Sequence, residues 1–181
     1  MPIQLEFSES MKRELQKIYS VEFTLADGLK MLSAMSQNPE LKAALETHQR
    51  ETEVHLERIR QICAKHGWSP IGMPSPAIRA MALEAMLTLA GPDPSPVVDA
   101  HIIAAAQKSE HFEMACYGFA RQLAMLVGDE ESAALLQQTL DEEKKTDELL
   151  TQIAESGINE AAASQADPQY ALSHGTNARM F

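Results

Sequence analysis

The stretch AAAQKSEHFEMACYGFA, residues 104–120, decides the fold because it sets acidic side chains in the middle of an apolar helical pattern. The apolar positions of this region return at the spacing of one helix face, namely Ile102, Ala106, Tyr117, Ala120 and Ala124. Glu110 and Glu113 flank that face at the midpoint of a helix expected from about Val97 to Val127. A carboxylate buried there without compensation would cost several kcal/mol. The pattern therefore predicts that something cationic lies beside these two acids.

Three further segments repeat this arrangement of an apolar face with acids near its centre. The expected helices and their acids are Ser8 to Gln37 with Glu22, Pro39 to near Gly67 with Glu51, and Glu130 to Ser156 with Glu143 and Asp147. Short joints at residues 38–39 and 128–129 make each consecutive pair of helices antiparallel neighbours. Because the midpoints of antiparallel helices of similar length lie at the same height, the acids are expected in one layer.

A long crossover joins the two helical hairpins. Prolines interrupt residues 68–76, helix-forming residues follow at 77–90, and residues 91–96 break the chain again. Two antiparallel hairpins with one crossover are typical of ferritin-like proteins, so we predict an all-α, ferritin-like four-helix bundle with an extra short crossover helix. This bundle should span residues 1–158. Residues 159–181 are small and polar without a sustained period, and we expect them to form a flexible C-terminal tail.

Two histidines of the second helix, His48 and His55, lie on the face that carries its apolar residues. The candidate metal ligands are therefore Glu22, His48, Glu51, His55, Glu110, Glu113, Glu143 and Asp147. Carboxylates bridge ions that lie a few ångströms apart, and imidazole can complete their coordination. We expect two metal ions, with iron as the first choice and manganese as the second. Such a centre would support oxidation of Fe(II) by oxygen or peroxide.

The candidate ligands divide into bridging and terminal groups. Glu51 or Glu113 would bridge the metals together with Glu143. The terminal ligands would be Glu22, Glu110 and Asp147. Tyr117, one turn beyond Glu113, could exchange an electron or form a hydrogen bond to a ligand.

An alternative interpretation needs no metal. Glutamates at helix midpoints are usually solvated, and a histidine on an apolar face is more often a core residue than a ligand. Arg121 could also neutralise a buried carboxylate. The protein would then be a metal-free helical dimer with a structural or interaction role, and the metal content of the purified protein distinguishes this interpretation from the metal site.

Outside the layer, the side chains of Glu53, Glu57 and Glu142 are expected to point away, and those of His101 and His111 to lie at the surface.

The charge balance and the apolar runs exclude several functions. The 181 residues include 26 Asp and Glu against 15 Lys and Arg, and the net charge of -11 argues against nucleic acid as a partner. No apolar run reaches the ~20 residues of a membrane span, and the N-terminus lacks the basic and apolar blocks of a signal peptide. We expect a cytoplasmic, single-domain protein whose Cys63 and Cys116 are core or interface residues.

A second apolar stripe on the helix of residues 97–127 concerns assembly. It consists of Ala105, Phe112, Cys116, Phe119 and Leu123. A helix that is apolar on two sides is buried on two sides. The second partner is the crossover helix, another copy of the chain or both, and we expect a homodimer.

Several stretches together resemble the bacterial stress-induced YciE/YciF-type proteins, a ferritin-like family classed as a domain of unknown function. They are Tyr19-Ser-Val-Glu22, residues 39–45 followed by His48, Glu51 and Thr52, residues 104–111 followed by Glu113, Tyr117 and Gly118, and residues 142–144 followed by Asp147. The resemblance implies a dimeric four-helix bundle with a crossover helix, distantly similar to rubrerythrin and other di-iron carboxylate proteins. It also implies a role in the bacterial stress response.

The resemblance to di-iron proteins carries over to individual residues. It matches Glu22 to the ligand of the first helix, Glu51 to that of the second, Glu110 and Glu113 to those of the third, and Glu143 to that of the fourth. The sequence departs from that pattern because it lacks the Glu-x-x-His spacing of ferritin-type di-iron sites. The fourth helix offers Asp147 instead of a histidine. An oxygen-rich coordination shell would admit manganese, magnesium or calcium more readily.

Overall fold

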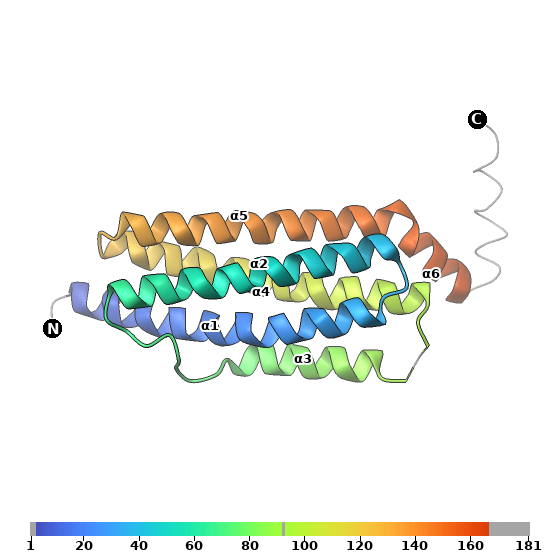
Figure 1. Ribbon diagram of the computed structural model, residues 1–181, viewed down its shortest axis with the longest axis horizontal. Helices are drawn as coiled ribbons and strands as arrows, with labels where there is room; N and C mark the ends of the chain where they lie inside the picture. The colour runs from blue at the N-terminus through green and yellow to red at the C-terminus, as the bar shows by residue number, and fades with distance from the viewer. Residues whose placement is uncertain (1–2, 92, 167–181) are drawn as a thin grey trace, which may run out of the picture.

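The computed structural model describes residues 3–91 and 93–166, and every regular element in this part of the chain is helical. The elements are α1 (Ile3–Met35), α2 (Pro39–Lys65), α3 (Pro76–Leu89), α4 (Pro96–Leu126), α5 (Glu130–Ile153), a π-helical turn η1 (Ala154–Ile158) and α6 (Asn159–Ala166). Figure 1 shows α1, α2, α4 and α5 lying side by side along the long axis, with α3 outside them. The hairpins α1–α2 and α4–α5 pack together through α1 against α4 and α2 against α5. The predicted four-helix bundle is confirmed.

Side-chain caps fix the helix boundaries close to the predicted ones. The Asn38 side chain accepts hydrogen bonds from the backbone N–H groups of Glu40 and Leu41, at 2.9 and 3.0 Å, and so begins α2. Ser75, Ser95 and Asp129 cap α3, α4 and α5 in the same way. One boundary was predicted wrongly, since α1 begins at Ile3 and not at Ser8.

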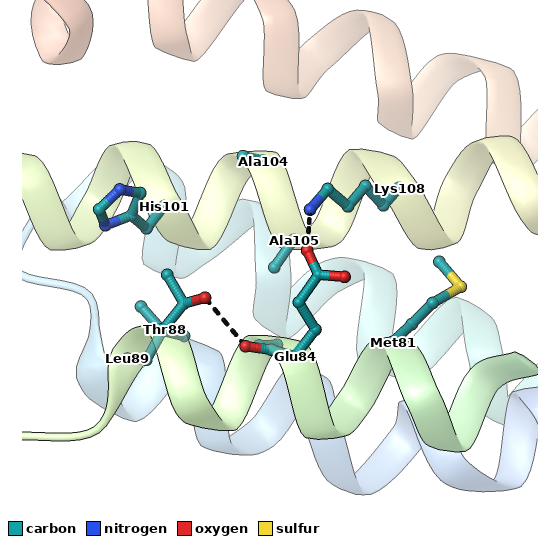
Figure 2. A pocket seen from close by; sticks show the side chains of 9 residues that line it. Met81, Glu84, Thr88, Leu89, His101, Ala104, Ala105 and Lys108 are labelled. Carbon is teal, nitrogen blue, oxygen red and sulfur yellow. Dashed lines mark hydrogen bonds and ion pairs between the residues drawn. The ribbon is translucent and has the colours of Figure 1, made fainter.

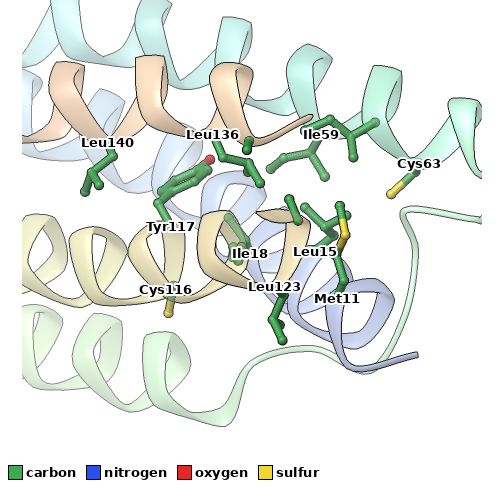
Figure 3. Close-up of a cluster of buried hydrophobic side chains, with 14 residues drawn as sticks. Met11, Leu15, Ile18, Ile59, Cys63, Cys116, Tyr117, Leu123, Leu136 and Leu140 are labelled. Atoms are coloured by element: carbon green, nitrogen blue, oxygen red, sulfur yellow. The ribbon is translucent and has the colours of Figure 1, made fainter. Parts of the chain in front are cut away.

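The apolar core is divided into two clusters, one toward each end of the bundle. The first cluster, shown in Figure 3, is built around Met11, Leu15, Ile18, Ile59, Ile62, Cys63, Cys116, Tyr117, Leu123 and Leu136. The second contains Leu29, Leu41, Leu45, Leu89, Val98, Ile102, Ile103, Leu150 and Ile153. In each of the four long helices the two sets are separated by an interval that carries one or two buried ionisable residues, such as Glu22 in α1. These intervals meet because neighbouring helices are antiparallel.

The crossover helix α3 lies against α4 and α1, so it covers part of the second apolar stripe of α4. Lys108 of α4 forms an ion pair with Glu84 of α3, and Figure 2 shows this contact beside Ala105. A mostly apolar cavity of about 490 Å³ lies between α1, α3 and α4. Leu83, Met86 and Leu87 of α3 are exposed, and of these Met86 also lines the cavity.

The start of the expected C-terminal tail is helical. Gly157 adopts a φ of 145° inside η1, which a side chain would disfavour, and the chain turns there. Ile158 then packs into the second apolar cluster, and α6 contacts α4. Alanines favour a helix in residues 159–166, and the anchored Ile158 holds this helix against the bundle. The rest of the expected tail, 167–181, lies outside the described residues.

Among the described helices, none has the length and apolar character required to cross a membrane.

Candidate metal centre

The polar intervals of the four long helices form one buried layer between the two apolar clusters. Its ionisable members are Glu22 of α1, His48 and His55 of α2, Glu110 and Glu113 of α4, and Glu143 of α5, and none is more than 3% exposed. Thr52 and Thr146 are buried beside them. The expected convergence of acids from the helices is therefore present for these residues.

The six ionisable side chains form two overlapping groups. One ligand atom from each of His48, Glu110, Glu113 and Glu143 lies within 4.8 Å of the others, and we call this group the His48 position. The same holds for Glu22, His55 and Glu143, which we call the His55 position. Glu143 belongs to both groups. Such sharing is the arrangement in which a carboxylate bridges two ions.

Several atoms of this layer lack a hydrogen-bond partner although they are buried. These atoms are Glu22 Oε2, His55 Nδ1, Glu110 Oε2, Glu113 Oε2, Glu143 Oε1 and Glu143 Oε2. His55 Nδ1 lies 3.0 Å from Glu143 Oε1, but the contact lacks the direction of a hydrogen bond. Buried polar atoms without partners are uncommon in native proteins. The donor set of carboxylate oxygens and imidazole nitrogens is the one that iron and manganese use.

The two histidines expose different ring nitrogens to the carboxylates. His48 Nε2 lies 3.0 Å from Glu110 Oε1 and 3.7 Å from Glu143 Oε2. His55 Nδ1 lies 3.0 Å from Glu143 Oε1 and 3.4 Å from Glu22 Oε1. The two rings are 6.4 Å apart between centroids. Because residues seven apart lie on nearly the same helix face, α2 alone supplies a nitrogen donor to each position.

Burial and mutual repulsion favour the protonated forms of the acids in this layer, so protons compete with cations for the site. Burial is the main cause that raises the pKa of Glu22 and, well above its usual range, that of Glu113; neighbouring carboxylates add to it. Burial likewise raises the pKa of Glu110 to about 7. Burial opposes the charge of His55, but Glu143 and Glu22 outweigh it and raise the pKa of His55 to about 10. The layer therefore holds protons when it holds no cation.

A buried tyrosine closes one side of the layer. The Tyr117 hydroxyl donates a hydrogen bond to Glu22 Oε1, and its ring lies edge-on to His55 with 6.2 Å between centroids. Burial and Glu22 raise the pKa of Tyr117 well above its usual value, so the phenol keeps its proton. The expected hydrogen bond from Tyr117 to a candidate ligand is thus present.

Two of the sequence-predicted ligands lie outside the buried groups. The Glu51 side chain is 41% exposed, and its Oε2 lies 3.7 Å from His48 Nδ1, on the side of the ring away from Glu110. Asp147 accepts a hydrogen bond of 3.2 Å from Gln107 and lies 3.4 Å from the exposed His111. His101 is exposed as expected. Neither Glu51 nor Asp147 therefore contributes to the site as it is arranged here.

One expectation about an outer residue was wrong. Glu142 was expected to point away, but its Oε2 lies 2.9 Å from His55 Nε2. Arg58, which the sequence did not single out, forms an ion pair with the same carboxylate. Together they lower the pKa of Glu142 to about 2, against the opposing effect of burial. No ion pair of Arg121 is found among the described residues, so no contact supports its expected role in neutralising the site.

The sequence matches the family described as Domain of unknown function (DUF892) over residues 6–163. It is 37% identical over 153 residues to Protein YciF of Escherichia coli strain K12, which covers 84% of this chain and 92% of that protein. The crystal structure of the E. coli stress protein YciF superimposes with a TM-score of 0.80 at 34% identity, over 84% of this chain and 97% of that chain.

Two other solved structures have similar folds. One is YcfI from Rhodopseudomonas palustris, for which a structural role is suggested; the TM-score is 0.77 at 31% identity, covering 80% of this chain and 92% of that one. The other is a protein from Xanthomonas campestris pv. campestris, with a TM-score of 0.70 at 20% identity over 89% of this chain and 98% of that chain. The latter is a likeness of fold alone. The helical bundle of this chain is thus the ferritin-like bundle of the YciF-type proteins.

Proposed function

The chain belongs to the family described as Domain of unknown function (DUF892) and is related to YciF of E. coli. We propose that its buried layer binds two metal ions. Iron is the proposed metal and manganese the second choice. The proposed function is oxidation of Fe(II) by oxygen or peroxide as part of the bacterial stress response. The description of E. coli YciF as a stress protein supports the last part of this proposal.

One observation carries the proposal, namely the buried side-chain atoms of the layer that have no hydrogen-bond partner. Every atom of this kind found in the described residues belongs to Glu22, His55, Glu110, Glu113 or Glu143. Desolvated carboxylates are costly unless a cation or a proton lies beside them. Four buried carboxylates would offset the charge of two divalent cations, and the unpartnered atoms would become ligands.

The buried residues of the layer would have different roles in such a site. Glu143 would bridge the two positions, Glu110 and Glu113 would complete the His48 position, and Glu22 would complete the His55 position. Tyr117 holds one oxygen of Glu22 and leaves the other oxygen free. The apolar clusters on both sides exclude water from the layer. When bound, iron would supply the electrons that reduce oxygen or peroxide.

The test combines metal content with Fe(II) oxidation. Metal-free protein is loaded with Fe(II) without oxygen, its bound iron is measured, and peroxide is then added while Fe(III) formation is followed by absorbance. We expect about two bound and oxidised ions per chain, a loss of both in Glu143→Gln, and no change in Glu53→Gln, which alters an exposed acid of α2. Wild-type protein that binds no more iron or manganese than Glu143→Gln would overturn the proposal.

A metal-free structural role is the second candidate, because the layer also offers internal charge compensation. His48 lies 3.0 Å from Glu110, and His55 lies 3.0 Å from Glu143, so protonated histidines would neutralise part of the acidic charge. The structural role suggested for YcfI points the same way. The two candidates differ in metal content, since only the first requires ions that disappear in Glu143→Gln.

We also propose that the protein is a cytoplasmic homodimer. The support for the dimer is the group of exposed apolar side chains on α3 and α4, which includes Leu83, Leu87 and Phe119. Exposed apolar groups of this kind are frequently covered by another subunit.

A further inference from the structure

Glu142 lies just outside the buried layer and contacts it through one atom. Its Oε2 is 2.9 Å from His55 Nε2, and its side chain is 22% exposed. Arg58 holds this carboxylate through both terminal nitrogens, and the Nη2–Oε1 distance is 3.0 Å. The same guanidinium donates to Thr139 Oγ1 at 2.9 Å. Two attachments on Arg58 and one on His55 leave the Glu142 carboxylate little freedom to move.

This contact determines which nitrogen of His55 can bind a cation. An ionised carboxylate can only accept hydrogen bonds, so His55 Nε2 must carry the proton that lies between it and Glu142. The lone pair of the neutral ring is then on Nδ1. That atom faces Glu22 Oε1 at 3.4 Å and Glu143 Oε1 at 3.0 Å. Without Glu142, the ring could place its proton on either nitrogen.

His48 has a different partner, and the two positions are therefore unequal. Its Nδ1 lies 3.3 Å from the neutral hydroxyl of Thr146, which also donates to the backbone carbonyl of Glu142 at 3.3 Å. The nearby Glu51 is 3.7 Å away and partly solvated. A carboxylate that accepts the other N–H of a metal-bound imidazole makes that imidazole a stronger donor. Only His55 has such a partner within hydrogen-bond distance.

We infer that Glu142, held by Arg58, is a positioning residue that directs His55 Nδ1 toward the His55 position and makes this histidine the stronger nitrogen donor of the pair. The inference rests on the proposed function, because the His55 position is one of the two proposed metal sites. Glu142 itself binds no metal. It acts through His55. Metal binding at the His55 position therefore depends on the Arg58 ion pair, whereas metal binding at the His48 position does not.

The test uses stepwise Co(II) titration of the full-length chain, followed by visible absorbance. In wild-type protein we expect two equivalents. In Glu142→Gln, the affinity of one equivalent should fall by about 10- to 100-fold, and it should be the equivalent that Glu22→Gln removes. The other equivalent should keep its affinity. Glu148→Gln, which alters an exposed acid of the same helix, is the matched control and should bind as wild type does.

A second measurement needs no metal. Proton NMR of the metal-free protein should show a downfield imidazole N–H proton from His55 that exchanges slowly because it is shared with Glu142. In Glu142→Gln this signal should shift upfield and exchange faster, while circular dichroism stays unchanged. Unaltered Co(II) affinities and an unaltered N–H signal in Glu142→Gln would overturn the inference while leaving the proposed metal site intact. Wild-type protein that binds no metal would instead overturn the proposed function, and the NMR signal alone would then decide the role of Glu142.

Discussion

The residues of the buried layer oppose the stability of the fold that holds them. Glu22, Glu113 and Glu143 are at most 1% exposed, and they approach one another although each can carry a negative charge. Apolar replacements of such groups often stabilise a protein, because desolvating a charge costs more than its interactions return. Buried acids of this kind are expected in a protein when they bind a ligand, here the proposed metal ions. Substitutions in the layer should therefore separate stability from metal binding.

The first prediction concerns Glu113→Gln. Burial and the neighbouring acids raise the pKa of Glu113 well above its usual value, so the folded protein binds this proton more tightly than the unfolded chain does. The corresponding stability is lost as the pH rises from the unfolded pKa toward the folded one. The variant avoids that loss, and its metal-free form should be more stable by about 1 kcal/mol near neutral pH. Urea unfolding measures the difference, which should grow with pH.

Metal affinity supplies the second half of that experiment. Glu113→Gln should bind the metal of the His48 position more weakly although it is the more stable protein. Glu53→Gln, on the exposed side of α2, should change neither quantity. A Glu113→Gln protein that is less stable than the wild type and binds metal normally would contradict a role for this carboxylate as a ligand.

The second prediction concerns the pH dependence of metal binding. The pKa of Glu110 is raised to about 7 by burial, and that of His55 to about 10 because Glu143 and Glu22 outweigh burial. Metal ions must displace the protons held below these values, so affinity should rise with pH. The rise is about tenfold per pH unit for each proton released. Mn(II) titration calorimetry between about pH 6 and about pH 8, in buffers of different ionisation enthalpy, counts the protons. A flat affinity would contradict the displacement.

The candidate residues were predictable where helical spacing alone decides their direction. His48 and His55 are seven residues apart and lie about 20° from each other around α2, so both face the layer. Glu51 is turned about 60° from His48. An apolar face is wider than this offset, so the spacing alone does not decide whether Glu51 faces the layer or solvent. Glu142 is turned about 100° from Glu143 and was assigned to solvent. It meets His55 because α5 packs directly against α2, which the sequence does not reveal.

At the scale of helices, the ends were predictable from their caps and the centres from their apolar period. Proline after a capping residue begins α2, α3 and α4, and these signals are local. The start of α1 lacks such a signal. Ile158, which directly precedes α6, packs into the second apolar cluster, and this tertiary contact is not predicted by composition.

The third prediction belongs to the joint between α1 and α2. Asp99 of α4 is 1% exposed and accepts hydrogen bonds from Ser36 Oγ at 2.8 Å and from the backbone N–H groups of Gln37 and Asn38, both at 3.1 Å. Asp99→Ala should lower the free energy of unfolding by about 2 to 3 kcal/mol, because the Ser36 hydroxyl and two part-buried backbone N–H groups lose a charged, buried acceptor. Urea unfolding of Asp99→Ala against Asp93→Ala, an exposed control, measures this.

Metal binding should distinguish the joint from the buried layer. Folded Asp99→Ala should keep the metal stoichiometry of the wild type, because Asp99 contacts the α1–α2 joint and none of the candidate ligands. A stability equal to that of Asp93→Ala would show that the joint does not depend on this carboxylate.

At the scale of the whole molecule, the bundle is two apolar cores held apart by one polar layer. The cores exclude water at both ends, and the antiparallel helices bring their midpoints together. The absence of a Glu-x-x-His spacing from the sequence does not remove the nitrogen donors, because α2 carries both histidines. The distribution of candidate ligands among the helices therefore differs from that of the ferritin-type di-iron pattern.

The fourth prediction concerns assembly. Leu87 on α3 is 70% exposed and Phe119 on α4 is 53% exposed, although both are large and apolar. If these side chains lie in a homodimer interface, Leu87→Glu and Phe119→Glu should shift the protein from dimer to monomer without loss of helicity. Sedimentation equilibrium measures the mass, and Glu53→Gln, which alters an exposed side chain of α2 and shifts the net charge by one unit in the opposite direction, is the control. A wild-type protein that sediments as a monomer or as a large cage would contradict the expected dimer.

The most direct test of the metal centre is anomalous X-ray scattering from crystals of protein loaded with Fe(II), measured at the iron edge. We predict two anomalous peaks in the layer, one among His48, Glu110, Glu113 and Glu143, and one among Glu22, His55 and Glu143. Glu143 should contact both. A layer without an anomalous peak, in which His55 Nδ1 donates a well-directed hydrogen bond to Glu143, would contradict the account.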